Sequence, residues 1–205
     1  MNQKDHQADR RTVIMQAAIN CFIEKGFHTT SMRDIASTAA VSLGNLYNYF
    51  PSKQALIAEV ANQEQVELAP LLCSLEQASA PAMEQIQQFL AAYWTLCRQP
   101  EWAILGAECL AEIARSPALM PKFENNRRQL LDALAGAIER AAQQGIFKPS
   151  APIRLVAQAL LDIVESDAFR RGLEAQAKSA KGKIDSSVEA MDIFHPGLLR
   201  GLLGA

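Results

Sequence analysis

The sequence lacks the residue clusters on which metal sites and most active sites depend. It contains three histidines and four cysteines, Cys21, Cys73, Cys97 and Cys109, with no Cys-x-x-Cys pair among them. This spacing indicates neither a zinc site nor a disulfide framework. A glycine-rich phosphate loop, a nucleophile elbow and a histidine pair are also absent from the sequence. We therefore expect a protein that is not an enzyme and that requires no metal and no cofactor.

The chain also lacks a strong charge of either sign and any long hydrophobic run. A net charge of -2 and an isoelectric point near 5.9 exclude a protein that coats nucleic acid through a broadly cationic surface. Residues 1–60 nevertheless carry six Lys or Arg against five Asp or Glu, which leaves room for a local nucleic-acid site. The N-terminus is polar, and no segment approaches the roughly eighteen apolar residues of a membrane span. These features predict a cytoplasmic protein.

No segment shows the alternating pattern of a β-strand, and apolar residues recur instead at spacings of three and four. Hydrophobic residues make up 49% and charged residues 20% of the 205 residues, which excludes wholesale disorder. The spacing predicts an all-α protein of about nine helices. The expected ranges are 10–25, a short helix after residue 31, 43–50, 53–78, 82–98, 101–114, 118–144, 152–175 and 187–203, the fourth strained or broken at Pro70.

The expected ends of the first helices coincide with residues that cap helices. Gly26 follows the first apolar stripe and is a C-cap candidate. Thr30 or Ser31 is placed to cap the second helix, Ser42 the third and Ser52 the fourth. The opening quarter of the chain therefore predicts a succession of helix, turn and short helix.

The second and third helices have the residue types of a helix-turn-helix. Ala36 is small where the two helices must touch, and Val41 supplies an apolar plug after the turn. Ile35 and Leu46 supply a shared core, which leaves an almost uncharged polar set pointing outward from the third helix. Asn side chains suit base edges, whereas hydroxyls and a lysine suit phosphates. The expected DNA-binding residues are Thr30, Ser31, Arg33, Ser42, Leu43, Gly44, Asn45, Tyr47, Asn48, Tyr49 and Lys53.

The segment TTSMRDIASTAAVSLGNLYNYFPSKQAL resembles the N-terminal signature of the TetR (TetR/AcrR-type) family of transcriptional regulators. The resemblance covers roughly residues 8–68. The pairs that occur in family order are Ile35-Ala36, Val41-Ser42, Leu46-Tyr47, Tyr49-Phe50 and Ser52-Lys53. One departure is Ala40, since the family commonly has glycine in this turn. A left-handed conformation at Ala40 would cost on the order of 1 kcal/mol.

The resemblance implies a helix-turn-helix DNA-binding domain at 8–68 and a helical regulatory, ligand-binding and dimerisation domain at 69–205. It further implies a sequence-specific regulator, expected to be a homodimeric repressor that a small-molecule effector releases from a palindromic operator. Dimerisation is expected through the last two helices, both of which are apolar around much of their circumference. The alternative for these two helices is that they are core helices of a monomer.

The expected effector is apolar or aromatic, because aromatic and soft side chains concentrate in the middle helices. The candidate ligand-binding residues are Tyr93, Trp94, Cys97, Trp102, Glu108, Cys109 and Phe123. Core packing is the competing interpretation for each of these residues, and oxidant sensing is a further one for Cys97 and Cys109. For the chain as a whole, the alternative function is a helical protein-interaction module that does not bind DNA.

Overall fold

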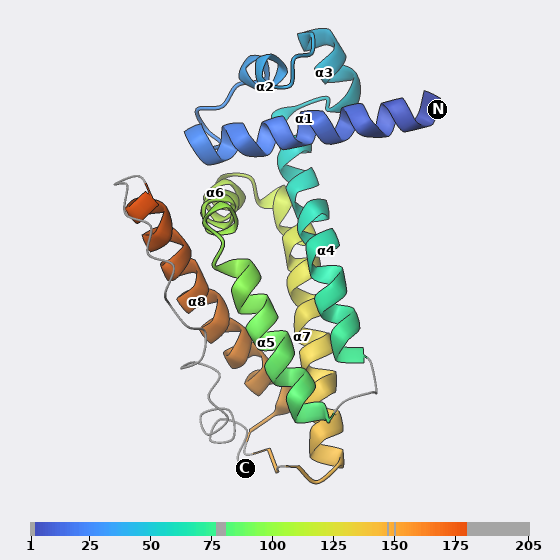
Figure 1. Ribbon diagram of the computed structural model, residues 1–205, viewed down its shortest axis with the longest axis vertical. Helices are drawn as coiled ribbons and strands as arrows, with labels where there is room; N and C mark the ends of the chain where they lie inside the picture. Colours follow the sequence, from blue (N-terminus) through green and yellow to red (C-terminus); the bar gives the residue numbers. More distant parts are fainter. Residues whose placement is uncertain (1–2, 77–80, 147, 150, 180–205) are drawn as a thin grey trace. The chain divides into compact units, whose positions relative to one another are not determined.

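The computed structural model describes residues 3–76, 81–146, 148–149 and 151–179 (Figure 1). These residues form eight α-helices and one 3-10 helix, and no strand occurs among them. The elements are α1 (Gln3–Lys25), α2 (Met32–Thr38), α3 (Leu43–Tyr49), α4 (Lys53–Glu76), α5 (Ala82–Cys97), α6 (Pro100–Arg115), η1 (Pro117–Leu119), α7 (Met120–Gln143) and α8 (Ile153–Ser179). The predicted all-α class is confirmed. The helix predicted at 187–203 lies outside the described residues.

Most helix ends fall within a few residues of their predicted positions, and two differences have a physical reason. Helix α1 begins at Gln3, whereas the apolar stripe begins only near residue 10, because a helix can continue through polar residues that bury nothing. Helix α4 runs through Pro70, so the predicted break does not occur. A proline removes one backbone hydrogen bond from a helix, and the remaining turns of this 24-residue helix are retained.

The chain divides into two compact units. The first contains the residues up to Glu64 together with Ile104–Phe123, and the second contains Gln65–Ala103 and the chain from Glu124. The core of the first unit joins α1, α2, α3 and the start of α4 to the second half of α6. Phe22 and Phe27 meet edge to face in this core, with ring centroids 4.4 Å apart. The predicted domain ranges 8–68 and 69–205 stay a prediction.

The second unit packs α5, α7 and α8 with the end of α4 (Figure 1). Gly172 of α8 is buried because a Cβ at this position would lie 2.7 Å from the Cβ of Ala103 and 3.0 Å from the carbonyl oxygen of Arg98. The glycine therefore lets α8 approach the segment between α5 and α6 closely.

Polar side chains also join α5 to α8 inside the second unit. The Tyr93 hydroxyl donates to Glu165 Oε1 at 2.7 Å, and Trp94 Nε1 donates to Asp167 Oδ2 at 2.9 Å. Arg127 of α7 forms an ion pair with Glu165. Burial raises the pKa of both Tyr93 and Glu165. Among the described residues, no helix is long and apolar enough to cross a membrane.

Candidate nucleic-acid interface

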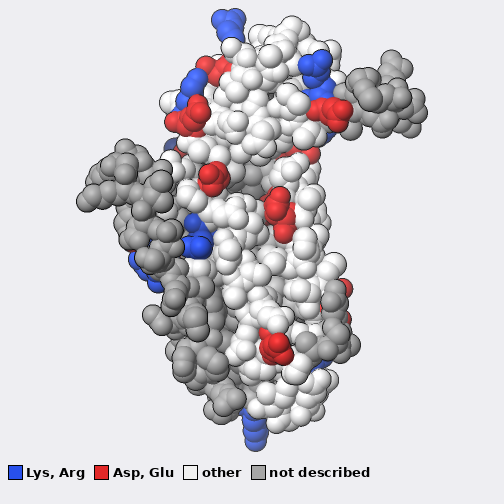
Figure 2. Space-filling model, viewed as in Figure 1, with Lys and Arg blue, Asp and Glu red and all other residues white. Residues whose placement is uncertain are grey.

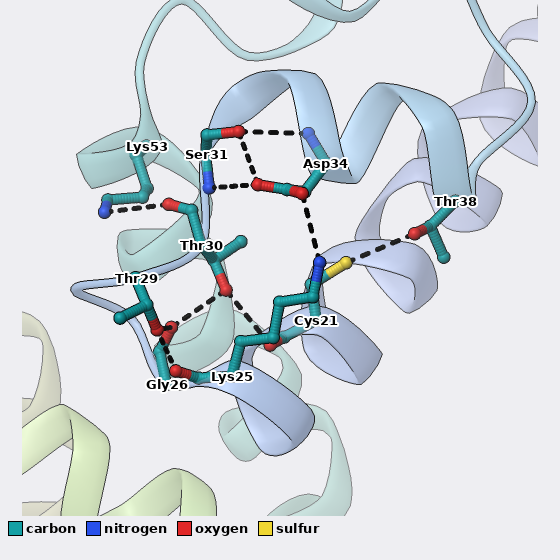
Figure 3. Close-up of polar contacts among 9 residues, drawn as sticks. All are labelled: Cys21, Lys25, Gly26, Thr29, Thr30, Ser31, Asp34, Thr38 and Lys53. Atoms are coloured by element: carbon teal, nitrogen blue, oxygen red, sulfur yellow. Dashed lines mark hydrogen bonds and ion pairs between the residues drawn. The ribbon is translucent and has the colours of Figure 1, made fainter.

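Helix α2 begins with a complete capping box. The Asp34 backbone N–H donates to Ser31 Oγ at 3.1 Å, and the Ser31 backbone N–H donates to Asp34 Oδ2 at 2.9 Å (Figure 3). Lys25 Nζ lies 3.0 Å from Asp34 Oδ1. Hydrogen bonds from Ser31, followed by the contact with Lys25, lower the pKa of Asp34 well below its usual range. Ser31 is thus the N-cap, and it orients the first turn of α2.

Thr30 acts inside the unit and does not face solvent. Its side chain is 1% exposed, and its hydroxyl donates to the carbonyl oxygens of Cys21 at 3.0 Å and Gly26 at 2.8 Å (Figure 3). Gly26 itself has φ +81°, as expected of a C-cap glycine. Thr30 therefore ties the start of α2 to the end of α1, which leaves its hydroxyl unavailable to DNA in this structure.

The turn between α2 and α3 contains an alanine in the left-handed conformation, in a turn where the family commonly has glycine. Ala40 has φ +51°, the left-handed region, and it is the only non-glycine residue with positive φ among those described. Its N–H donates to the Ser37 carbonyl at 3.1 Å, and the N–H of Val41 donates to the Ala36 carbonyl at 3.0 Å. An alanine held there costs on the order of 1 kcal/mol, which these bonds and the packing on either side offset.

Helix α3 presents an uncharged surface outward. Ser42 caps the helix, accepting from the Asn45 N–H at 3.1 Å, and Leu46 is fully buried beneath it. Tyr47 is 46% exposed, and Asn48 is exposed beside it. Between Leu43 and Tyr49 there is no charged residue. This surface can donate and accept hydrogen bonds without ion pairing.

The other residues predicted on α3 differ in exposure. Gly44 is exposed, and a Cβ added there would meet no atom within 4 Å. Leu43 and Tyr49 are half-buried and pack against the core of the first unit, and Asn45 is also half-buried. Leu43 and Tyr49 therefore hold α3 in place with part of their surface.

The predicted cationic contacts fall into two kinds. Arg33 is exposed in the first turn of α2. Lys53, by contrast, points into the loop between α1 and α2, where Nζ donates to the carbonyl oxygens of Phe27 and His28. It also donates to the carbonyl oxygen of Thr30 (Figure 3). Figure 2 shows acidic and basic side chains scattered over the viewed face without a cationic patch.

Two residues that join the helices of the first unit were not predicted from the sequence. Arg11 of α1 pairs with Glu59 of α4 at 2.9 Å and lies over the Phe50 ring, 4.4 Å from its centroid. The two charges are 48 positions apart, so no local spacing could reveal their contact. Together they join α1, α4 and the end of α3.

The seven predicted effector residues are divided between the two units. Glu108, Cys109 and Phe123 belong to the first unit, and the other four belong to the second. Glu108 accepts a hydrogen bond from the Phe27 N–H at 2.7 Å. Burial raises the pKa of the Cys109 thiol to about 12, which is the opposite of the shift expected for a redox-sensing thiol. Of the remaining four, Tyr93 and Trp94 are buried with their polar atoms bonded to α8, and Cys97 and Trp102 are half-buried.

A short exposed helix that follows a tight turn, in an all-α fold, defines a helix-turn-helix DNA-binding protein. Residues 14–60 match the family model described as bacterial regulatory proteins, tetR family. The transcriptional regulator RutR of Escherichia coli (strain K12) is 31% identical over 149 residues, covering 72% of this chain and 68% of RutR. The chain belongs to the TetR family, and it is a DNA-binding transcriptional regulator.

Two further relatives extend the similarity over most of the chain. The transcriptional regulator UidR of Escherichia coli (strain K12) is 28% identical over 191 residues, covering 88% of this chain and 92% of UidR. The solved structure of Salmonella enterica GusR has a TM-score of 0.72 at 24% identity and covers 95% of both chains. The family match and the regulators RutR and UidR confirm the predicted regulator over the alternative of an interaction module without DNA binding. The named relatives are regulators and not enzymes.

Proposed function

We propose that this chain is a homodimeric repressor that binds a palindromic operator in the cytoplasm and is released by a small-molecule effector. The observation that carries the proposal is the exposed, uncharged surface of α3. This helix has only seven residues, so one copy can read few base pairs. Two copies about 34 Å apart would read successive half-sites, which is the geometry of a two-fold symmetric operator.

The DNA contacts that the structure supports are the exposed members of the predicted set. Asn48 is proposed to contact bases, and Ser31, Ser42, Tyr47 and Arg33 to contact the phosphate backbone. Gly44 is proposed to allow a close approach of the backbone to DNA, and Asn45, Leu43 and Tyr49 contribute the part of their surface that remains exposed. The predicted domain ranges 8–68 and 69–205 are part of this proposal.

Dimerisation is proposed through α8 together with the segment predicted as a helix at 187–203. Three large apolar side chains on α8 are exposed to solvent: Leu155 at 58%, Ile163 at 40% and Leu173 at 38%. A second copy would cover such a face in a two-fold interface. Ile163→Glu should therefore convert a dimer into a monomer in sedimentation-velocity experiments, and an unchanged dimer would place the interface elsewhere.

The effector is proposed to be apolar or aromatic and to bind in the second unit, where Tyr93, Trp94, Cys97 and Trp102 concentrate aromatic and soft side chains. It would lower DNA affinity by binding more tightly to a conformation whose two reading helices no longer match the half-sites. To move the equilibrium from 1:99 to 99:1 it must favour that conformation by about 10⁴-fold.

The test of DNA binding begins with selection from a random duplex library by the full chain, followed by fluorescence anisotropy on the recovered sequence. Asn48→Ala should weaken binding by roughly five-fold or more, because a lost base contact costs about 1–3 kcal/mol. Val66→Ala is the matched control, since Val66 is 65% exposed and lies outside the helix-turn-helix. Failure to recover any palindromic sequence would overturn the proposed function.

A further inference from the structure

The loop between α1 and α2 is held by a single ammonium group. Lys53, the first residue of α4, directs Nζ to the Phe27 carbonyl oxygen and to that of His28 at 3.3 Å. The third acceptor is the Thr30 carbonyl oxygen at 3.0 Å (Figure 3). A lysine ammonium carries three donors. The three carbonyls therefore use the full hydrogen-bonding capacity of Lys53, and none is left for a phosphate.

The same loop is held from a second side by a carboxylate. Glu108 Oε2 accepts from the Phe27 N–H at 2.7 Å, and Gly26, next to Phe27, leaves the space that this carboxylate fills. The two polar groups of Phe27 are thus bound by side chains of opposite charge. The loop leads directly into the capping box at Ser31, so its position determines where α2 begins.

Arg33 differs from Lys53 in its exposure and in its lack of hydrogen-bonded partners among the described residues. It is exposed on α2, and the described part of the chain shows no carboxylate paired with it. Of the other cations described near the helix-turn-helix, Arg11 is paired with Glu59 and Lys25 with Asp34. Arg33 can therefore reach a phosphate at no cost in existing contacts, whereas Lys53 would have to give up at least one of its three hydrogen bonds.

We propose that Lys53 is a positioning residue: it supports DNA recognition by fixing the loop 27–30, and through it α2 and α3, and does not contact phosphate. The inference rests on the proposed function, because it concerns how the same helix-turn-helix meets its operator. A positioning role for Lys53 and a phosphate contact would affect sequence discrimination differently. A phosphate contact strengthens binding to every duplex alike, whereas correct placement of α3 strengthens binding only to the operator.

The experiment compares wild type with Lys53→Met, Lys53→Arg and Arg33→Gln, by anisotropy on the selected operator and on an unrelated duplex, between 50 and 200 mM salt. Circular dichroism at the assay temperature confirms that each variant is folded. Each phosphate contact contributes about 0.9 to the slope of log affinity against log salt. For a dimer that loses two such contacts, the wild type would fall about 12-fold more than the variant across this four-fold salt range.

We expect Lys53→Met to weaken operator binding by the same factor at every salt concentration, with binding to the unrelated duplex unchanged. Lys53→Arg should also weaken operator binding, because a planar guanidinium cannot place its donors on three converging carbonyls, although it is a good phosphate ligand. It retains the charge and the stem, so it provides a folded comparison should Lys53→Met fail to fold. Arg33→Gln should instead show the loss of salt dependence.

A reduced salt slope in Lys53→Met, with equal weakening on both duplexes, would overturn the inference. Unchanged operator affinity in Lys53→Met or in Lys53→Arg would overturn it as well. These outcomes differ from failure of the proposed function, in which the wild type itself would not distinguish the selected duplex from the unrelated one.

Discussion

The contact between Gly26 and Glu108 predicts a measurable coupling between two residues 82 positions apart. Gly26 has φ +81°, and a Cβ there would lie 3.1 Å from Glu108 Oε1 and 3.2 Å from Oε2. Gly26→Ala would therefore add left-handed strain of about 1–2 kcal/mol. It would also push the carboxylate away from the Phe27 N–H by a few tenths of an ångström, which should cost about 1 kcal/mol of a charge-assisted bond worth roughly 1.5–3 kcal/mol.

The total expected loss for Gly26→Ala is about 2–3 kcal/mol in the free energy of unfolding. The assay is urea unfolding followed by circular dichroism, applied to the wild type, Gly26→Ala, Glu108→Ala and the double variant. In the Glu108→Ala background the displaced carboxylate is gone, so Gly26→Ala should cost about 1 kcal/mol less than in the wild type. Equal costs in both backgrounds would refute the reasoning. Gly145→Ala is a useful control, because Gly145 has φ +73° but its added Cβ would meet nothing within 4 Å.

Four further changes are predicted. Ser31→Ala removes the N-cap of α2 and should lower the free energy of unfolding by about 1 kcal/mol, measured by the same urea titration. Gly172→Ala forces a Cβ to within 2.7 Å of the Ala103 Cβ and should cost about 1–3 kcal/mol, visible as a lower Tm in calorimetry. Because the folded state lowers the pKa of Asp34, its carboxylate adds stability above the unfolded pKa, near 4, that is lost as the pH falls towards the folded value. Wild type should thus lose stability on acidification more steeply than Asp34→Asn, and parallel profiles would argue against the capping box. Ala40→Gly should stabilise by about 0.5–1 kcal/mol, the relieved strain outweighing the greater freedom of the unfolded chain, and a loss of stability would contradict this.

The parts of the fold that could be predicted are those decided within a few residues. Ser31, Ser42 and Ser52 cap their helices as predicted, because a capping side chain bonds a backbone N–H only three positions away. The turn itself followed from the two short helices on either side, whereas the left-handed conformation of Ala40 was left open until the structure showed φ +51°. The exposure of Tyr47 followed from the burial of Leu46 on the opposite side of α3.

The parts that could not be predicted depend on contacts between distant segments. Residue type alone suggested that Lys53 meets phosphate, but its three acceptors are carbonyls about 25 positions earlier. The apolar pattern of α6 indicates a buried face without indicating which core receives it, so the placement of Cys109 and Ile113 in the core of the first unit was missed. For the same reason the hydrogen bond that Glu108 accepts from the Phe27 N–H, 81 positions away, could not be predicted.

The left-handed conformation of Ala40 predicts which mutation of this regulator should be selected first for stability. Alanine and glycine codons differ at one base, so the unstrained form of the turn at Ala40 is a single nucleotide substitution away. Ala40 is exposed. A library that contains every single-base substitution of this codon therefore includes the glycine variant. Selection of such a library for function at raised temperature should enrich it early, ahead of changes that require repacking of the core.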